Sequence, residues 1–532
     1  MNSFSSRFRK KSTWIAILFW GFLLSVSMYR LAEAPIGFFA DEAGIGLAAW
    51  DFLHGDWSLI YSFGFYRHLN EYYLGLLGPL STMPFVFLFG LTDWAVRAAS
   101  VTYGLITLFI WSKIMDKMGL RGKYGALFLI WSIPLFFHPM RTQFGLTVSL
   151  MYLSFALWIL ICSNKLSRVG AFGVGFLGVA SGYGNNGFIV SGTVCVACMA
   201  LGGYFTRFFQ FKRQMIVLVC YFLIGCMFAL FPFALALGRE PLFLKRIIEK
   251  NASSGQALFS KEKILFDVGQ YPRYFDLGYL LNRGEVDSQG SGNFRHTISG
   301  FGQFSYLQGG VIAFGLGCLA FVRRYRRFRY VLVATVALFL TYPLADIISQ
   351  NGIRPPYTYS IYILVLPSAL CIMYGVDALV YLAESKEKIK KYIIRLLIGA
   401  GLVYGLVYFG SYFHTYLTPT VNTAGFYGWQ WGPREIVLYL TEHENEYDEL
   451  YIQGVFNAGT VFIPFYDPHN ICKDKCKLGG FEMYNTNKKQ LFVLQSSSLK
   501  EYMAAIPWLR EVNRLLNPAD KEKTSYYFMT PR

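Results

Sequence analysis

RFFQFKRQMIVLVCYFLIGCMFALFPFALAL, residues 207–237, contains the pattern that decides the fold of this chain. A short basic cluster at 207–213 precedes an uncharged apolar block at 214–237. A transmembrane helix needs about 20 apolar residues to cross a hydrocarbon core of about 30 Å. Lys and Arg are retained in the short cytoplasmic loops beside such helices. The segment therefore predicts a membrane-spanning helix whose N-terminal end faces the cytoplasm.

Apolar blocks of similar length recur through most of the chain. Of its 532 residues, 54% are hydrophobic and 15% charged, whereas a soluble domain carries about 25% charged residues. Counting blocks of about 20 residues predicts a polytopic α-helical membrane protein with about eleven transmembrane helices. We expect these spans at about 14–31, 93–112, 124–140, 144–162, 169–184, 187–206, 214–237, 304–322, 330–349, 357–382 and 393–413.

The net charge of +17 is distributed in short clusters between the apolar blocks. This is the pattern of the positive-inside rule, whereas a nucleic-acid surface is more often a continuous basic patch in a soluble segment. We therefore expect no nucleic-acid partner. An odd number of spans places the N-terminus in the cytoplasm and the C-terminus outside. The clusters lie at 7–11, 113–123, 165–168, 207–213, 323–329 and 386–395.

The chain divides into a transmembrane domain, 1–413, and a more polar C-terminal domain, 414–532. Within the first domain, 32–92 and 238–303 are predicted external loops. The semi-apolar stretch 72–90 is expected to form juxtamembrane helices, because a span there would place the following basic clusters on the wrong side.

The C-terminal domain is predicted to be a small extracytoplasmic α/β domain. Residues 436–440 have a helical pattern, and short β-rich runs at 449–455 and 460–465 indicate strands. Cys472 and Cys476 suggest a local disulfide if this domain faces an oxidising compartment. A zinc half-site is the weaker alternative, since no second Cys/His pair stands at ligand spacing.

Candidate chemistry begins directly after the first span, at Asp41 and Glu42 in the segment FFADEA, 38–43. Glycosyl transfer from a lipid phosphate needs a base for the acceptor and cations for the leaving phosphate. Carboxylates at the membrane surface are suited to the first task. They are equally well explained as interfacial charges that end one helix or cap the next.

Several cationic side chains lie on predicted external turns, against the trend of the positive-inside rule. Arg binds phosphate oxygens with paired hydrogen bonds. The alternative for each residue is contact with lipid head groups or snorkelling. The candidates for the donor phosphate are Arg67, His68, His138, Arg141 and Arg354.

A Gly-rich stretch of the second external loop contains Arg295 and His296. A loop of this length is either a lid or acceptor-binding element or a plain connector. Nucleotide-binding and hydrolase motifs are absent from the sequence. The predicted spans also hold few ionisable residues, which ion-coupled transporters usually need near the middle of the bilayer.

These features together resemble the GT-C superfamily of membrane glycosyltransferases, in particular bacterial transferases of the dolichyl-phosphate-mannose and aminoarabinose type. The resemblance covers most of the chain and rests on the order of several motifs. They are Asp41-Glu42-Ala43, Gly78-Pro79, the run from Phe89 to Arg97, Ile353–Tyr357 and Val461–Pro468.

The resemblance implies an inverting transfer from a polyprenyl-phosphate-linked sugar to a glycan, lipid or protein acceptor, with Asp41 as the essential base and Glu42 supporting it. Members commonly carry a second acidic residue after the third span, where this chain has His138, Arg141 and Gln143. That departure favours direct contact of cations with the phosphate and no required metal or cofactor. The Lys-rich loops and the absence of targeting signals predict a bacterial inner membrane, with the site on its outer face, and an endoplasmic-reticulum protein is the alternative with the same pattern.

Two other classes of function remain open on the sequence. A transporter or flippase of a lipid-linked glycan would also need a lipid groove and external cations, but it predicts charged residues in both halves of the bilayer. A non-catalytic subunit of an envelope-assembly complex predicts that Asp41 is dispensable.

Overall fold

The computed structural model describes residues 2–531 with gaps at 63, 69–71, 163–165, 186–187, 189–191, 193, 195–196, 198–211, 240–260, 286–295, 299, 350–355, 357, 385–386, 419–428, 455 and 457. Arg295, Arg354 and most of the expected span 187–206 lie outside the described residues.

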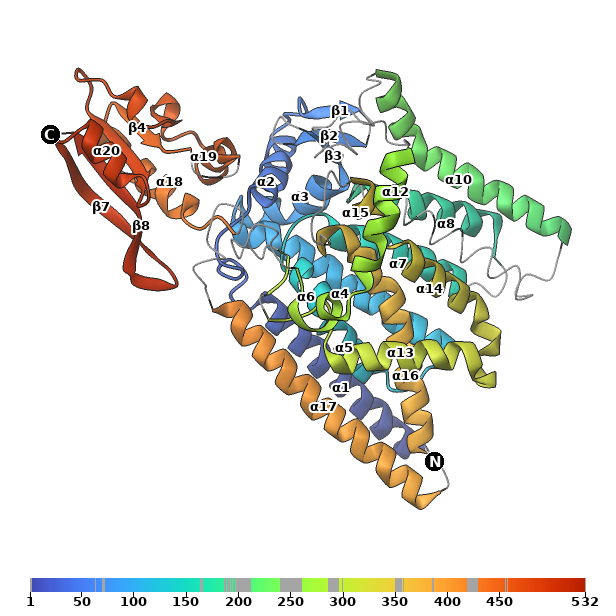
Figure 1. Cartoon of the computed structure of the whole chain (residues 1–532). Coiled ribbons are helices and arrows are strands. Elements are labelled where there is room, and N and C mark those ends of the chain that lie inside the picture. Colours follow the sequence, from blue (N-terminus) through green and yellow to red (C-terminus); the bar gives the residue numbers. More distant parts are fainter. Residues whose placement is uncertain are drawn as a thin grey trace.

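A bundle of apolar helices forms the body of the molecule (Figure 1). Its first half contains α1 (Asn2–Met28), α4 (Asp93–Met118), α5 (Lys123–Trp131), α6 (Pro134–Met140), α7 (Leu146–Cys162), α8 (Arg168–Ala180) and α10 (Lys212–Arg239). Its second half contains α12 (Lys261–Gln270), α13 (Tyr306–Phe321), α14 (Arg329–Thr341), α15 (Leu344–Ser349), α16 (Val365–Ala383) and α17 (Lys388–Leu417).

Helices long and apolar enough to cross a membrane lie on the outside of this bundle as well as inside it. Among the described residues there are four, Asp93–Met118, Ile216–Arg239, Thr358–Ala383 and Lys388–Leu417, and shorter apolar helices accompany them. On α10, Met227 and Phe228 are about two-thirds exposed. Extended apolar surface of this kind marks contact with a membrane. The chain is therefore a polytopic α-helical membrane protein.

The expected span 124–140 is interrupted. Helix α5 ends at Trp131 and α6 begins at Pro134, with Ile133 in an extended conformation (φ −63°, ψ 122°). Proline disfavours a helical conformation in the preceding residue, which explains the break. The expected span 330–349 likewise divides into α14 and α15 around Pro343.

The first external segment forms a small layer at one end of the helical body (Figure 1). It consists of α2 (Ala40–Leu53), the antiparallel strands β1 (Ile60–Ser62), β2 (Phe65–His68) and β3 (Tyr72–Gly75), and α3 (Leu77–Phe89). The stretch 72–90, predicted to be helical throughout, therefore begins with a strand. Its helical part covers only 77–89.

The C-terminal region is an α/β domain with a five-stranded sheet in the order β5-β4-β6-β8-β7. The first three strands are parallel to one another, and β8 and β7 extend the sheet in antiparallel fashion. The elements are α18 (Pro433–Glu442), β4 (Glu449–Ile452), α19 (Phe462–Tyr466), β5 (Cys476–Leu478), β6 (Gln490–Gln495), α20 (Leu499–Ala505), β7 (Leu509–Asn517) and β8 (Asp520–Pro531).

One predicted strand of this domain is wrong. Residues 460–465 form the end of a 3-10 turn, Gly459–Val461, and most of α19. Phe462 and Phe465 are both buried, and a spacing of three residues is the period of a helix face. Short apolar runs do not distinguish a strand from a helical turn, and Pro464 cannot donate to a strand ladder.

The C-terminal domain packs directly on α2. The rings of Phe38 and Phe465 lie 5.0 Å apart in an apolar core shared by both. Gly46 of α2 permits this approach, because a Cβ there would lie 2.6 Å from a methyl carbon of Val96 and 2.8 Å from the Phe465 ring. The helix that carries Asp41 and Glu42 is therefore held between the membrane body and the C-terminal domain.

Candidate active site

The first turn of α2 carries the two predicted carboxylates, and its N-terminus is anchored by a residue distant in sequence. The backbone N–H of Ala40 donates to Gln430 Oε1 at 3.0 Å. The N–H of Phe39 donates to Glu42 Oε2 at 3.4 Å. Carboxylates are favoured at this end of a helix because of the unpaired N–H groups and the helix dipole.

Glu42 is completely buried and paired with Arg97 of α4. Its two oxygens accept from Arg97 Nε at 3.1 Å and Nη2 at 3.0 Å, and Oε1 also accepts from the backbone N–H of Gln143 at 2.9 Å. Arg97 donates further to the carbonyls of Leu31, Pro35 and Gly37. Glu42 therefore fixes α2 against α4 and the turn after α6, and it has no surface with which to contact a substrate.

Asp41 has different surroundings, although it is the neighbouring residue. Its side chain is 22% exposed, and Oδ1 lies 3.4 Å from Nε2 of the fully buried His68. Nδ1 of His68 lies 2.8 Å from the hydroxyl of Tyr66. The residues Tyr66, His68 and Asp41 thus form a chain that ends on an accessible carboxylate.

The proton positions in this chain follow from the acid strengths of its members. Burial raises the pKa of Tyr66 well above 10, and the nearby Asp41 carboxylate adds to the shift. Tyr66 therefore keeps its proton and can donate it to Nδ1 of His68. With Nδ1 as the acceptor, the other ring nitrogen, Nε2, carries a proton that faces Oδ1 of Asp41.

Arg67 and His68, adjacent in sequence, point to opposite faces of β2. Arg67 is exposed, whereas Phe65, Tyr66 and His68 are buried. Alternate side chains of a strand point to opposite faces, so Tyr66 and His68 share the face toward Asp41. In the sequence, the two-residue spacing of Tyr66 and His68 on a short β-rich run is the signal that marks Tyr66 as a partner of His68. The sequence analysis did not single out Tyr66.

His296 of the second external loop lies in the same region. Its ring is 5.4 Å from the rings of both Phe144 and Tyr359. The Tyr359 hydroxyl is close enough to Tyr66 to influence the pKa of Tyr66. The Phe144 ring also lies 6.2 Å from that of Phe39, directly before α2, so His296 packs near the start of the helix that carries Asp41. The sequence did not single out Tyr359.

His138 and Arg141 are both buried, at the end of α6. The two terminal nitrogens of Arg141 donate to backbone carbonyls in the last turn of α1 and just after it: Nη1 to those of Val26 and Ser27, and Nη2 chiefly to those of Tyr29 and Ala34. These bonds satisfy carbonyls at the end of α1 and in the following turn. The ring of His138 packs 5.4 Å from that of Trp429.

Cys472 and Cys476 are joined by a disulfide in the C-terminal domain. No group of three or more His, Cys, Asp or Glu side chains suited to a metal ion occurs in the described part of the chain.

The chain thus combines an apolar helical bundle, an external layer with a carboxylate at a helix N-terminus, and an α/β domain packed on that helix. This is the architecture expected from the resemblance to the GT-C superfamily. The comparison with solved structures supports this fold over nearly the whole chain. The crystal structure of ArnT from Cupriavidus metallidurans bound to undecaprenyl phosphate matches with a TM-score of 0.58 and 13% identity over 98% of both chains. The apo state of the same protein matches with a TM-score of 0.55 and 12% identity over the same share of both chains.

A third structure is less similar. It is the archaeal oligosaccharyltransferase AglB from Archaeoglobus fulgidus with an inhibitory peptide and a dolichol-phosphate, with a TM-score of 0.45 and 11% identity over 86% of this chain and 64% of that one. No protein-family model and no curated protein matches the sequence.

Proposed function

We propose that this protein is a membrane glycosyltransferase that moves a sugar from a polyprenyl-phosphate carrier to an acceptor hydroxyl, with Asp41 as the general base. The observation that carries the proposal is the contrast within one helical turn. Glu42 is buried in an ion pair, whereas Asp41 is accessible and oriented by His68. A fold similar to that of a protein crystallised with undecaprenyl phosphate supports the choice of donor.

In the proposed reaction, the acceptor oxygen attacks the anomeric carbon of the donor while Asp41 takes its proton. The bond between that carbon and the phosphate oxygen breaks on the opposite side, so the configuration inverts and polyprenyl phosphate leaves. The developing charge on the phosphate needs cations. Of the cations expected there, we assign this task to Arg354. Arg67 points to the face of β2 opposite Tyr66 and His68, and His68 is fully buried between Tyr66 and Asp41, so we assign neither a contact with the phosphate.

His138 and Arg141 have a more restricted part in this proposal. Because both terminal nitrogens of Arg141 are occupied by backbone carbonyls, we assign it a contribution through its positive charge alone. His138 is equally buried and packs against the ring of Trp429, so we assign it the role of holding that side chain in place. We further propose that the site faces the extracytoplasmic side of a bacterial inner membrane, which suits the disulfide in the C-terminal domain.

A transfer assay with a matched variant tests the base. Purified protein would receive radiolabelled polyprenyl-phosphate sugars and a pool of lipid and glycan acceptors, with Asp41→Asn compared to Asp51→Asn. Asp51 is a carboxylate on the same helix, at its other end. General base catalysis contributes about 10²–10⁴-fold, so Asp41→Asn should lose at least 100-fold and Asp51→Asn should retain activity. Equal activity of Asp41→Asn and wild type would disprove the assignment.

A further inference from the structure

A short segment before the C-terminal domain, residues 429–432, reaches the start of the helix that carries Asp41. The backbone N–H of Ala40, the first residue of α2, donates to Oε1 of Gln430 at 3.0 Å. A helix usually receives a side-chain acceptor for its first N–H groups from Ser, Thr, Asp or Asn at the N-cap position. Here that position holds Phe39, which has no polar side chain. Gln430 therefore supplies, from a distant part of the chain, an acceptor that the local sequence does not provide.

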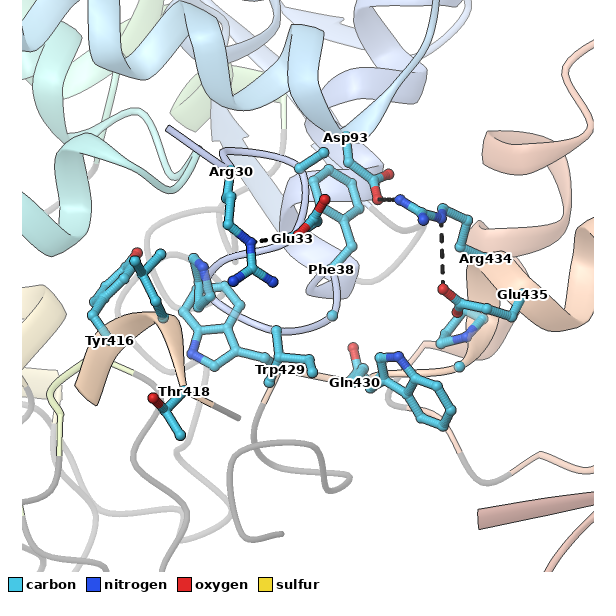
Figure 2. A pocket seen from close by; sticks show the side chains of 18 of the residues that line it. Arg30, Glu33, Phe38, Asp93, Tyr416, Thr418, Trp429, Gln430, Arg434 and Glu435 are labelled. Atoms are coloured by element: carbon cyan, nitrogen blue, oxygen red, sulfur yellow. Dashed lines mark hydrogen bonds and ion pairs between the residues drawn. The ribbon is translucent and has the colours of Figure 1, made fainter. Parts of the chain in front are cut away.

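The residue before Gln430 is fixed in the membrane body. Trp429 is 1% exposed, and its ring packs against three other rings, those of His138 at 5.4 Å, Phe144 at 6.1 Å and Phe39 at 6.4 Å. Figure 2 shows Trp429 and Gln430 next to each other on this stretch of chain. Because close-packed side chains hold one arrangement, Gln430 is attached to a rigid point of the molecule.

The backbone approaches closely at the same place. A Cβ atom on Gly37 would lie 1.5 Å from the carbonyl oxygen of Trp429, so no larger residue fits there. The carbonyl of Gly37 also accepts from Nη2 of Arg97 at 2.7 Å. The φ of Gln430 is 20°, which is uncommon for a residue other than glycine. Strained backbone of this kind persists where the surroundings determine it, and it clusters at functional sites.

The position of Asp41 depends on this arrangement because Asp41 follows Ala40 directly. Oδ1 of Asp41 lies 3.4 Å from Nε2 of His68, whereas N–H···O hydrogen bonds are usually about 2.7–3.2 Å long. The contact is therefore at the limit of its range, and a small displacement of the first turn of α2 would break it. In an active site, a misplacement of about 1 Å costs about 100-fold in rate.

The rest of α2 has anchors of its own. Glu42 is paired with the buried Arg97, and Gly46 lies against Phe465 of the C-terminal domain. Loss of the Gln430 acceptor should therefore loosen only the first turn and leave the helix folded. An effect on the position of the base is thus separable from a general loss of structure.

We infer that Gln430 is a positioning residue for the proposed base: its amide oxygen holds the first turn of α2 so that the Asp41 carboxylate stays against His68. The inference rests on the proposed function for the role of Asp41 as the base. The hold of Gln430 on the helix is independent of that role and is measurable without a reaction. The segment that leads into the C-terminal domain then belongs to the arrangement that orients the base.

Two substitutions of Gln430 and one matched control test the inference by kinetics. Gln430→Leu removes the acceptor at similar size, whereas Gln430→Glu keeps an oxygen at the same reach. In the control, Gln453→Leu, the lost Oε1 accepts the backbone N–H of Gln495 at 2.9 Å within the C-terminal domain. Gln430→Leu should lower kcat about 10- to 100-fold and leave the donor KM unchanged. Gln430→Glu should recover most of this loss, and Gln453→Leu should behave as the wild type.

Amide hydrogen exchange, followed by mass spectrometry on the full chain in lipid nanodiscs, measures the anchoring itself. Peptides that cover residues 38–43 should exchange faster in Gln430→Leu than in wild type, Gln430→Glu or Gln453→Leu. Peptides from α4 and from the five-stranded sheet should exchange at the wild-type rate, which shows that the variant is folded. If Gln430→Leu does not fold, Gln430→Asn takes its place, because the shorter side chain keeps the amide but draws its oxygen away from Ala40.

Wild-type exchange at residues 38–43 in a folded Gln430→Leu or Gln430→Asn would overturn the inference. Wild-type kcat in that variant, or a loss expressed only in KM, would do the same. A wild type that transfers no sugar, while exchange responds as expected, would contradict the proposed function and still support the hold of Gln430 on α2.

Discussion

Replacing Glu42 with Gln is expected to destabilise the protein strongly, and the structure shows why in atomic detail. Oε1 of Glu42 accepts from Arg97 Nε and the N–H of Gln143, and Oε2 accepts from Arg97 Nη2 and the N–H of Phe39. A Gln amide group must replace one of these oxygens. Either orientation places N–H against one donor of Arg97 and one backbone N–H.

The size of the effect follows from the burial of both partners. Arg97 and Glu42 are both fully buried, and removing one charge of a buried pair costs about 3–5 kcal/mol. The double variant with Arg97→Met removes the uncompensated charge, so its cost should be smaller than the sum of the two single costs by about 1–3 kcal/mol.

Equilibrium unfolding by SDS in mixed micelles measures these differences. The matched control is Glu33→Gln, because Arg30 and Glu33 form an ion pair at 2.6 Å that is half-exposed, and exposed pairs contribute little. A Glu42→Gln cost no greater than that of Glu33→Gln, or strictly additive single costs, would refute the reasoning.

Further outcomes are expected for three variants and for the pH dependence of the wild type. Tyr66→Phe should lower kcat about tenfold without changing the donor KM, because the His68 ring then loses the hydrogen bond that fixes which of its nitrogens carries the proton facing Asp41. Since burial raises the pKa of Tyr66 above 10, its ionisation should not lower the wild-type rate between pH 8 and 10. Gly46→Leu should expose the C-terminal domain to limited proteolysis, because the new side chain meets Val96 and Phe465. A hydrogen bond from Lys488 lowers the pKa of Glu449 to about 2. That contribution to stability is present above about pH 4.5 and lost as pH falls toward 2, so Lys488→Met should make the full chain sensitive to pepsin at a higher pH.

The sequence predicted those features of the fold that depend on composition and length. The apolar block at 214–237 became α10, and the polar remainder after the last span became an α/β domain. The breaks within spans at Pro134 and Pro343 were not predicted. Average hydropathy defined the spans, and it does not register that proline disfavours a helical conformation in the preceding residue. The helix α19 was missed because a short apolar run fits either period.

The candidate site was predicted in part, and the reason lies in contacts between distant residues. The placement of Asp41 at the start of a helix follows from local sequence. The partner of Glu42 is 55 residues away, and Gln430 lies 390 residues from Ala40. No local pattern reveals that Arg97 is an internal partner, that Arg141 binds backbone carbonyls, or that Trp429 packs against the turn before α2.

The fate of a defined donor tests the central claim most directly. Purified protein in liposomes would receive a polyprenyl-phosphate sugar labelled in both the sugar and the lipid, with a glycan acceptor, and both products would be quantified. The account predicts one free polyprenyl phosphate for each sugar transferred, with neither product formed by Asp41→Asn. Movement of intact donor across the bilayer without cleavage, or equal cleavage by Asp41→Asn, would contradict it.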